Sequence, residues 1–334
     1  MKFSIIIPTY RHLEDCLIKC CQSIIKFTNL DDIEILVVAN GCGNDGTKEY
    51  VESLGNPFRL IWIEEQLGYT KSINIGIKES KGEFVILLNN DCEILPSEKN
   101  QWIEILNKPF KDSKVGMTGI HEIFSKEINS NFLVFYCVMI RKEVFEKIGL
   151  LDETFSPGYY EDADFYARLL RGDYICINCD SNAQQTEKLM VGSFPLYHAG
   201  SSTMHDEEHS KEYDKIVIRN TEILKRKYGK NEKKIKYSIV IPTYNQCDNL
   251  LKPCLESLKA TTDLSDVEVI VVANGCVDNT EEYVNSLGEP FKLFFYKEQL
   301  GFTKATNIGM KMALGEYIVL LNNDVILYQN ETGW

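Results

Sequence analysis

Two segments of this 334-residue chain repeat one another about 233 residues apart. FSIIIPTY at 3–10 matches YSIVIPTY at 237–244, VVANGC at 37–42 recurs at 271–276, and LLNND at 87–91 recurs at 320–324. A period of this size is that of a whole domain, far longer than the roughly 20–50 residues of a solenoid repeat. We therefore expect a first domain over residues 1–228, a linker at 229–236 and a second, incomplete copy over 237–334.

Short apolar runs alternate with amphipathic stretches in the first copy. The apolar runs have the length and composition of strands, and they cover residues 3–7, 33–38, 58–63 and 84–88. Helical periodicity fills the segments between them, at about 13–27, 47–54 and 70–80. This alternation predicts an α/β fold with a mainly parallel sheet. Ligands bind such sheets at the carboxyl ends of the strands, so the polar sequences PTY, ANGCGND and NND mark the expected active face.

The pattern becomes less regular after Asp91. The elements expected there are a helix near 97–108, strands at 115–120 and 132–140, a short helix near 142–149, a strand that carries Cys176 and a charged helix over about 206–228. Such a mixture predicts that the second half of this domain differs from the regular βαβ units of its first half.

Composition limits the classes of protein to which the chain can belong. Hydrophobic residues make up 44% and charged residues 25%, as in ordinary globular proteins. The formal net charge of −13 argues against a nucleic-acid partner. Eleven cysteines, with no signal-peptide pattern ahead of the first strand, indicate a reducing, cytoplasmic location. No apolar run approaches the roughly 20 residues of a transmembrane helix, so any membrane association is expected to be peripheral.

Asp91 and His198 are candidates for metal binding. A carboxylate at the carboxyl end of a buried strand is well placed to bind a hard divalent cation through oxygen. The alternative for Asp91 is structural, because aspartate also caps helices and turns. His198, in LYHAGSS, presents the same choice between a metal ligand and an ordinary, partly buried histidine.

Glu161, Asp162 and Asp164 are candidates for acid–base chemistry. They stand at the start of the helical pattern ADFYARLL, where the helix dipole favours ionised carboxylates. An ionised, positioned carboxylate can remove the proton from a sugar hydroxyl as a general base. The alternative is again structural, with helix capping and an i,i+4 pair between Asp164 and Arg168.

Taken in order, these motifs resemble those of family 2 glycosyltransferases. The motifs are SIIIPTY, EILVVANGCGNDGT, LGYTKSINIGIKESKGEFVILLNND, GYYEDADFYARLLRGDY and YHAGSS, and the resemblance covers residues 3–228 and again 237–327. It implies a GT-A fold and an inverting enzyme of polysaccharide biosynthesis. Such an enzyme moves a sugar from a nucleotide-diphosphate donor, here a UDP- or dTDP-sugar, to a glycan or other hydroxyl acceptor. The resemblance also implies Mg²⁺ or Mn²⁺ as cofactor.

The same resemblance implies roles for individual residues. Asp162 would be the general base, and Glu161 would orient it or the acceptor. Asp91 and His198 would be the protein ligands of the metal. The donor would be bound by Pro8, Thr9, Tyr10, Ala39, Asn40, Lys71, Asn74, Asn89 and Asn90.

Two positions depart from the family's pattern. Ala39 stands where the family usually has an aspartate that hydrogen-bonds the nucleobase, so base recognition would fall to Asn40 or to backbone groups. Asn89 replaces the first acid of the D-x-D element, a variant that resembles rhamnosyltransferases and removes one charge from the metal site. These departures favour one alternative, a nucleotide-sugar-binding or scaffolding module that carries out no transfer.

The second copy repeats only part of the first. It keeps IPTYN, VVANGC and LLNND, but no counterpart of the Glu161–Asp162 pair or of His198 follows them. We therefore expect residues 237–334 to form the nucleotide-binding half of a second domain that is catalytically incompetent as it stands.

Overall fold

The structure is a computed structural model that describes residues 1–180, 184–185, 190–191, 193–200, 207–228 and 235–328. The chain divides into two compact units, Met1–Asn220 and Thr221–Trp334, which are called unit 1 and unit 2 below. Each unit is described by itself.

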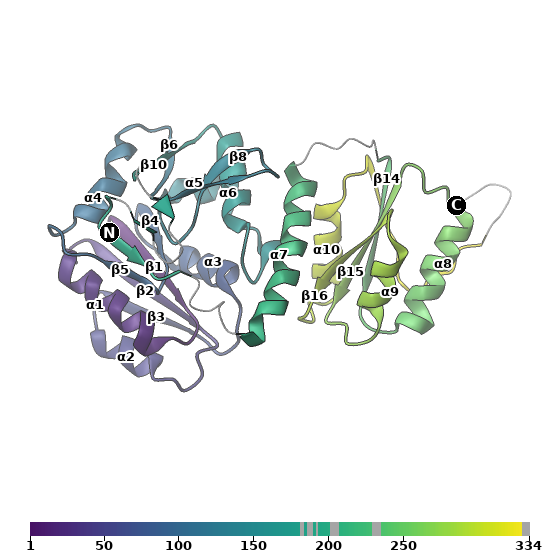
Figure 1. Ribbon diagram of the computed structural model, residues 1–334, viewed down its shortest axis with the longest axis horizontal. Coiled ribbons are helices and arrows are strands. Elements are labelled where there is room, and N and C mark those ends of the chain that lie inside the picture. The colour runs from purple at the N-terminus through teal and green to yellow at the C-terminus, as the bar shows by residue number, and fades with distance from the viewer. Residues whose placement is uncertain (181–183, 186–189, 192, 201–206, 229–234, 329–334) are drawn as a thin grey trace. The chain divides into compact units, whose positions relative to one another are not determined.

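A seven-stranded sheet forms the centre of unit 1, in the order β10-β6-β9-β4-β1-β2-β3 (Figure 1). Within this sheet β9 runs antiparallel to β4 and β6, and the other neighbouring strands run parallel to one another. The prediction of an α/β fold with a mainly parallel sheet is confirmed. The strands are β1 (Phe3–Thr9), β2 (Ile33–Asn40), β3 (Phe58–Ile63), β4 (Phe84–Leu88), β6 (Val115–Gly119), β9 (Cys137–Arg141) and β10 (Ile175–Asn178).

Helices cover both faces of this sheet. Alternate residues of a strand point to opposite faces, so Ile5 packs in one core with Ile24, whereas Ile6 packs in the other with Ile73. Burial on both sides explains why β1 and β2 are near-continuous apolar runs. The helices of unit 1 are η1 (Leu13–Leu17), α1 (Ile18–Phe27), α2 (Thr47–Leu54), α3 (Tyr69–Glu79), α4 (Gln101–Asn107), α5 (Lys142–Ile148) and α6 (Glu161–Arg171), with short turns η2 (Lys108–Lys111) and η3 (Glu153–Phe155).

Three small two-stranded sheets complete the described part of unit 1. β5 (Cys92–Ile94) pairs with β13 (Leu196–His198), β7 (Glu122–Ser125) with β8 (Ser130–Leu133), and β11 (Gln184–Gln185) with β12 (Met190–Val191). All three pairs are antiparallel. The first pair matters for function, because it brings the segment around His198 beside the end of β4.

Two sequence predictions in this region are wrong in detail. The apolar run 132–140 is not one strand but two, β8 and β9, which belong to different sheets. The chain changes partner between them, since Val134 N–H bonds His121 O at 3.0 Å and Tyr136 O accepts from Asn89 N–H at 2.9 Å. The helix expected from 97 begins only at 101, because Asn100 adopts a left-handed conformation with φ of 69°.

Unit 2 is built on a four-stranded parallel sheet in the order β16-β15-β14-β17. Its strands are β14 (Tyr237–Thr243), β15 (Val267–Asn274), β16 (Phe291–Tyr296) and β17 (Tyr317–Leu320), and its helices are η4 (Cys247–Leu251), α8 (Lys252–Thr261), α9 (Thr280–Leu287) and α10 (Phe302–Met312). Thr243 pairs with Ala273 as Thr9 pairs with Ala39. β17 has one neighbour among the described strands, whereas β4 has two.

The division between the units falls inside α7 (Glu207–Tyr228), between Asn220 and Thr221. The end of this helix joins unit 2, where Arg226 forms an ion pair with buried Glu268 and lies over the ring of Phe294. Of the expected linker, residues 229–234 lie outside the described residues.

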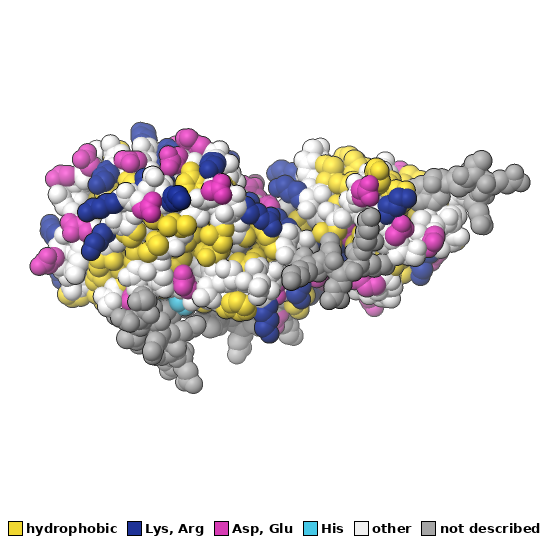
Figure 2. All heavy atoms as spheres, turned by 90° about the horizontal axis from the view of Figure 1, so that it is seen from above, with side chains coloured by type: hydrophobic (Ala, Val, Ile, Leu, Met, Phe, Trp, Pro, Cys, Tyr) yellow, Lys and Arg dark blue, Asp and Glu magenta, His cyan; other side chains and the backbone are white. Residues whose placement is uncertain are grey.

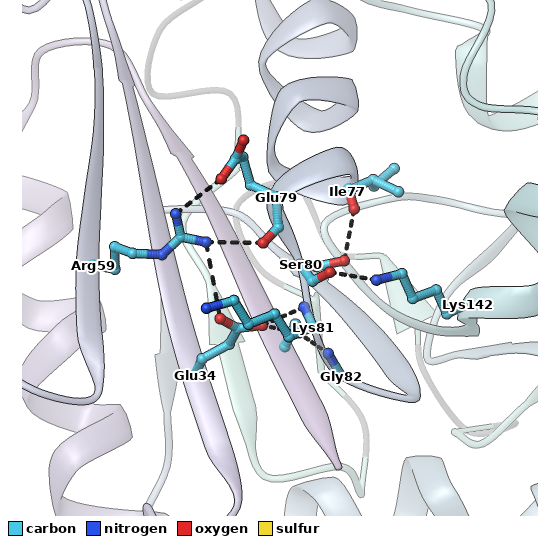
Figure 3. Close-up of polar contacts among 9 residues, drawn as sticks. Glu34, Arg59, Ile77, Glu79, Ser80, Lys81, Gly82 and Lys142 are labelled. Atoms are coloured by element: carbon cyan, nitrogen blue, oxygen red, sulfur yellow. Dashed lines mark hydrogen bonds and ion pairs between the residues drawn. The ribbon is translucent and has the colours of Figure 1, made fainter. Parts of the chain in front are cut away.

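The amino-terminal end of the unit 1 sheet is closed by a polar cluster (Figure 3). Buried Glu34 accepts hydrogen bonds from Ser4 Oγ at 2.6 Å and Lys81 N–H at 2.5 Å. Arg59 lies 4.0 Å from the other oxygen of this carboxylate and also bonds Glu79 at 3.0 Å. Glu34 is therefore a structural residue whose buried charge is matched by donors.

The surface of unit 1 carries both signs of charge. On the face shown in Figure 2, basic and acidic side chains are interspersed around a band of hydrophobic ones. Among the residues that the structure describes, no helix combines the length and the apolar character needed to cross a membrane.

Candidate active site

The carboxyl ends of β1, β2 and β4 meet at one edge of the unit 1 sheet. Thr9 joins them, because its carbonyl accepts a hydrogen bond from Asn40 Nδ2 at 2.9 Å and its Oγ1 accepts from Asn90 Nδ2 at 3.0 Å. Pro8 is buried in β1, and Tyr10 is half-buried at its end. The fold thus brings together the residues that the PTY and NND motifs indicated.

Asn40 and Ala39 do not present their side chains as the sequence suggested. Asn40 is 3% exposed, and its Oδ1 accepts from the backbone N–H groups of Leu67 at 3.1 Å and Gly68 at 3.2 Å. Both lone pairs of this oxygen are therefore used inside the protein. Ala39 is completely buried within the sheet. The Asn40 amide thus serves the fold in this structure, which leaves the backbone groups around Ala39 and Asn40 for the expected contact with the base or ribose.

Asn74 also holds the fold together. Its Nδ2 donates to Leu151 O at 2.9 Å and to Glu153 Oε1 at 3.0 Å, while its Oδ1 accepts from Leu151 N–H at 3.0 Å. The side chain is 2% exposed, and the expected contact with the donor stays a prediction. Lys71, one turn earlier on α3, is half-buried.

An open hollow of about 590 Å³ lies beside the ends of β1 and β2, lined by residues 11–15 and 42–45. Glycine and small polar residues predominate in the second lining segment, and the backbone of Gly43 has a positive φ of 63°. The hollow has the room that a nucleobase requires. Its second lining segment belongs to the motif ANGCGND, which the sequence marked as part of the active face, whereas residues 11–15 were not singled out.

Asp91 and His198 come together at the end of β4. His198 Nε2 lies 3.3 Å from Asp91 Oδ1 because β13 pairs with β5, and Ala199 N–H donates to Asp91 O at 3.1 Å. His198 Nε2 and Asn89 Oδ1 are buried, and neither forms a hydrogen bond to another described residue. Nitrogen and oxygen atoms of this kind are ligands for a divalent cation. The residues present therefore fit the metal that the sequence implied.

Cys92 lies within the same group but suits a metal poorly. The ligand atoms of Asp91, Cys92 and His198 all lie within 4.8 Å of one another. The Cys92 thiol, however, donates to Tyr136 O at 3.5 Å, and burial raises its pKa well above the usual range. Because a thiol must lose its proton to bind a metal, Cys92 is better explained as part of the core.

Tyr136 fixes the orientation of the His198 ring. The two rings stack in parallel, with centroids 4.1 Å apart and planes at 10°. Tyr136 is 3% exposed, and its backbone carbonyl also accepts from Asn89 N–H at 2.9 Å. It therefore supports both sides of the candidate metal site. Sequence reasoning missed it, because one tyrosine inside an apolar run carries no signal of a stacking partner far along the chain.

Glu161 and Asp162 begin α6 and are almost fully buried, at 5% and 9% exposure. Burial raises the pKa of Asp162 to about 7, although an N–H bond from Ala163 at 2.8 Å acts in the opposite direction. Burial, followed by the neighbouring charge of Asp162, raises the pKa of Glu161 well above its usual range. Glu161 Oε2 forms no hydrogen bond to another described residue. Asp162 is thus poised to exchange a proton near neutral pH, whereas Glu161 keeps its proton to higher pH.

Two other buried acids show what a structural carboxylate looks like in this fold. Asp164 accepts from Arg168 Nε at 2.8 Å, which confirms the predicted i,i+4 pair, and Glu34 is surrounded by donors (Figure 3). Glu161 and Asp162 have no such cation within salt-bridge distance among the described residues. The contrast favours a chemical role for this pair over a structural one.

Comparisons with known proteins find sequences similar to this chain. The family model described as "Glycosyl transferase family 2" matches residues 4–128 and 238–332. An uncharacterized glycosyltransferase of Rickettsia felis is 24% identical over 379 aligned residues, which cover 98% of this chain and 62% of the relative. The chondroitin synthase of Pasteurella multocida is 25% identical over 389 residues, which cover 96% of this chain and 38% of the relative. The chain thus spans less than two thirds of the length of either relative.

Among solved structures, a mannosyltransferase from Pyrobaculum calidifontis in complex with GDP-Man and Mn²⁺ is similar to this chain. The identity is 15% and the TM-score is 0.45, and the match covers 68% of this chain and 61% of the other.

Proposed function

The chain belongs to glycosyl transferase family 2, and we propose that unit 1 transfers a sugar from a nucleotide-diphosphate donor to a hydroxyl acceptor with inversion at the anomeric carbon. The observation that carries this proposal is the buried carboxyl pair at the start of α6, Glu161 and Asp162. It lies in the same unit as the paired Asp91 and His198. The curated relatives are longer than this chain, so the proposal concerns unit 1 and not a whole relative.

The nucleotide is proposed to bind at the carboxyl ends of β1 and β2. The hollow there takes the base and ribose, which Tyr10 and the backbone of residues 11–15 and 42–45 contact. Because the Asn40 amide is used inside the fold, the base is recognised chiefly by backbone groups. The diphosphate extends toward Asn89 and Lys71, and a UDP- or dTDP-sugar is the proposed donor.

Asp91 and His198 are proposed to hold a divalent cation, Mg²⁺ or Mn²⁺. When bound, such a cation supplies positive charge beside the diphosphate that leaves the sugar. The chain's own residues fix the ligands beforehand. Pairing of β13 with β5 keeps the two side chains 3.3 Å apart, and the Tyr136 ring holds the imidazole plane. Little rearrangement is then needed when the donor arrives.

Asp162 is proposed as the general base. It removes the proton from the acceptor hydroxyl while that oxygen attacks the sugar C1 from the face opposite the diphosphate, and the C1–O bond to the diphosphate breaks. A pKa of about 7 suits this role, because the carboxylate is ionised in a large fraction of molecules at neutral pH and still binds a proton well. Glu161 keeps its proton to higher pH and orients the acceptor through its buried Oε2.

Unit 2 is proposed to be a second domain of the same kind. The family model matches residues 238–332, and Asn274 bonds Thr243 O at 2.6 Å as Asn40 bonds Thr9 O. We propose that it contributes no transfer by itself.

A donor panel tests the function. UDP-, dTDP- and GDP-sugars are incubated with the full chain, a mixture of glycan acceptors and Mn²⁺ or Mg²⁺, and release of the nucleoside diphosphate is measured with and without EDTA. We expect metal-dependent release from one donor, with loss of that release in Asp91→Ala and Asp162→Asn.

Two outcomes would contradict parts of the proposal. If Asp162→Asn released the nucleoside diphosphate at the normal rate, either Asp162 would not be the general base of unit 1 or unit 2 would be active. Tight binding of one nucleotide without release from any donor would favour the alternative, a binding or scaffolding module.

A further inference from the structure

The chain immediately before Glu161 has a backbone conformation that needs external support. Tyr159 and Tyr160 both lie in the left-handed region, with φ of 77° and 70°. For residues other than glycine this conformation is strained, because the Cβ lies too close to the neighbouring backbone. Two such residues in succession persist only where the surrounding structure holds them. The position of Glu161 and Asp162 therefore depends on whatever holds this segment, residues 155–160, which we call the acid loop.

Asn220, on α7, provides that support. Its side chain is completely buried. Its Nδ2 lies 3.0 Å from Phe155 O, 2.8 Å from Gly158 O and 2.9 Å from Tyr159 O. An amide nitrogen carries two hydrogens, so three carbonyls share two donors. One side chain thus gathers three backbone groups of the acid loop around a single point.

Neighbouring residues of α7 strengthen this contact. Arg219 donates to Ser156 O through one guanidinium nitrogen and to Asn220 Oδ1, at 2.9 Å, through Nε. The ring of Tyr213 meets that of Tyr159 edge to face at 4.7 Å. The orientation of the Asn220 amide is therefore fixed from its own helix.

The opposite side of the acid loop rests on the start of α3. Thr70 N–H donates to Pro157 O at 3.3 Å, and Ser156 Oγ donates to Leu67 O at 3.3 Å. Gly68 leaves room for the loop, because a Cβ at this position would lie 2.4 Å from Pro157 Cβ. The acid loop is thus held between α3 and α7.

The connection continues from the loop to the acids. Asn220 holds the carbonyl of Tyr159, and the carbonyl of the next residue, Tyr160, accepts from Asp164 N–H at 3.0 Å in the first turn of α6. A shift of Tyr159 therefore moves this turn, which carries Glu161 and Asp162.

We propose that Asn220 is a positioning residue for the Glu161–Asp162 pair: it holds the acid loop in the conformation that presents both carboxyls to the acceptor, although its own side chain contacts neither. The expected effect of Asn220 on the rate of transfer rests on the proposed transferase function. Its structural consequence, an ordered acid loop, can be measured independently. In a positioned active site a displacement of about 1 Å can cost roughly 100-fold in rate.

The test compares Asn220→Ala with wild type in the full chain. We expect kcat to fall at least tenfold, with the KM for the donor and the Kd of the nucleotide changed by less than twofold. We also expect faster hydrogen–deuterium exchange in peptides that cover residues 155–164, with no change in peptides from β1 and β2. Thr118→Val is the matched control, because Thr118 is completely buried in β6 and its hydroxyl also donates to a backbone carbonyl, Leu106 O, at 2.9 Å. It should lower thermal stability without changing kcat.

Arg219→Ala keeps the test decisive if Asn220→Ala does not fold. Arg219 is only half-buried, so its removal leaves the fold intact while releasing Ser156 O. A smaller loss of kcat, of about threefold or more, and faster exchange in the acid loop are expected. Unchanged exchange in the acid loop would overturn the inference whatever the activity. Faster exchange with unchanged kcat would overturn it as well. If the wild type itself transfers no sugar, the proposed function fails. Hydrogen–deuterium exchange alone then tests whether Asn220 holds the acid loop.

Discussion

Replacing Asp162 by asparagine should abolish sugar transfer and, at the same time, make unit 1 more stable at neutral and alkaline pH. The two effects have one cause, the burial of a carboxyl that must ionise in order to act as a base. Asparagine has nearly the same shape and keeps an oxygen that can accept the Ala163 N–H bond. It cannot ionise, so it avoids the free-energy penalty of a buried charge.

The size of the stability effect follows from the pKa. Burial raises the pKa of Asp162 from 3.8 to about 7. Because the folded pKa lies above the unfolded one, this group's contribution to stability is fully present below about pH 4 and is lost as the pH rises through about 7. Each pKa unit corresponds to about 1.4 kcal/mol. Between pH 5 and pH 8 the free energy of unfolding of the wild type should therefore fall by about 3 kcal/mol more than that of Asp162→Asn.

Urea unfolding at pH 5 and pH 8 measures this difference. Trp62 and Trp102 both lie in unit 1, so the tryptophan fluorescence of a Trp334→Phe background reports the unfolding of that unit. Asp31→Asn, at an exposed position, is the control and should show no pH-dependent gain. If the gain in unfolding free energy of Asp162→Asn over wild type is the same at both pH values, the reasoning is refuted. Ionisation of the buried carboxyl would then carry no free-energy penalty.

Three further predictions follow from the same geometry. The value of kcat/KM should rise with pH up to about 7 and then level off, because Asp162 must be ionised; a flat profile from pH 5 to 8 would contradict this. His198→Ala should weaken Mn²⁺ binding at least tenfold in electron paramagnetic resonance titrations. An unchanged affinity would show that His198 is not a metal ligand. Gly68→Ala should destabilise its unit more than Gly301→Ala does: both glycines have positive φ, of 78° and 75°, but only at the first would a Cβ meet Pro157. Equal decreases in melting temperature for the two variants would contradict the predicted clash with Pro157.

The regular half of unit 1 could be predicted from the sequence to within a few residues. Parallel strands covered on both faces are continuous apolar runs, and each ends where polar residues follow, so β1 to β4 are visible as segments. The run 132–140 is equally apolar but was assigned wrongly. Its division depends on His121 O and Asn89 N–H, which are distant in the sequence. Hydrophobicity records burial and does not record a change of pairing partner.

The asparagines show the same limit at the candidate site. The resemblance to family 2 glycosyltransferases implied contacts with the donor for Asn40, Asn74 and Asn90. Only the hydrogen bonds show that Asn40 and Asn74 serve the backbone. An amide can satisfy a ligand or a neighbouring loop with the same atoms, and sequence spacing does not distinguish the two. Asn220 was missed for the converse reason, because it lies in a charged helix with no motif around it.

These backbone-directed amides join the two halves of the proposed reaction. Asn40 ties the end of β1 to the Leu67–Gly68 turn, that turn supports Pro157, and Asn220 holds the other side of the same loop. Transfer requires the acceptor oxygen to lie about 3–3.5 Å from the sugar carbon, so a rigid connection between donor site and base is an advantage. In unit 2 the amide of Asn274 also bonds the backbone of Gly301, but no described atom would lie within 4 Å of a Cβ there. In the described part of unit 2 this amide contact is thus made without a loop packed against the glycine. In unit 1 the same contact leads on to the acid loop, and Asp162→Asn is therefore expected to abolish transfer by unit 1.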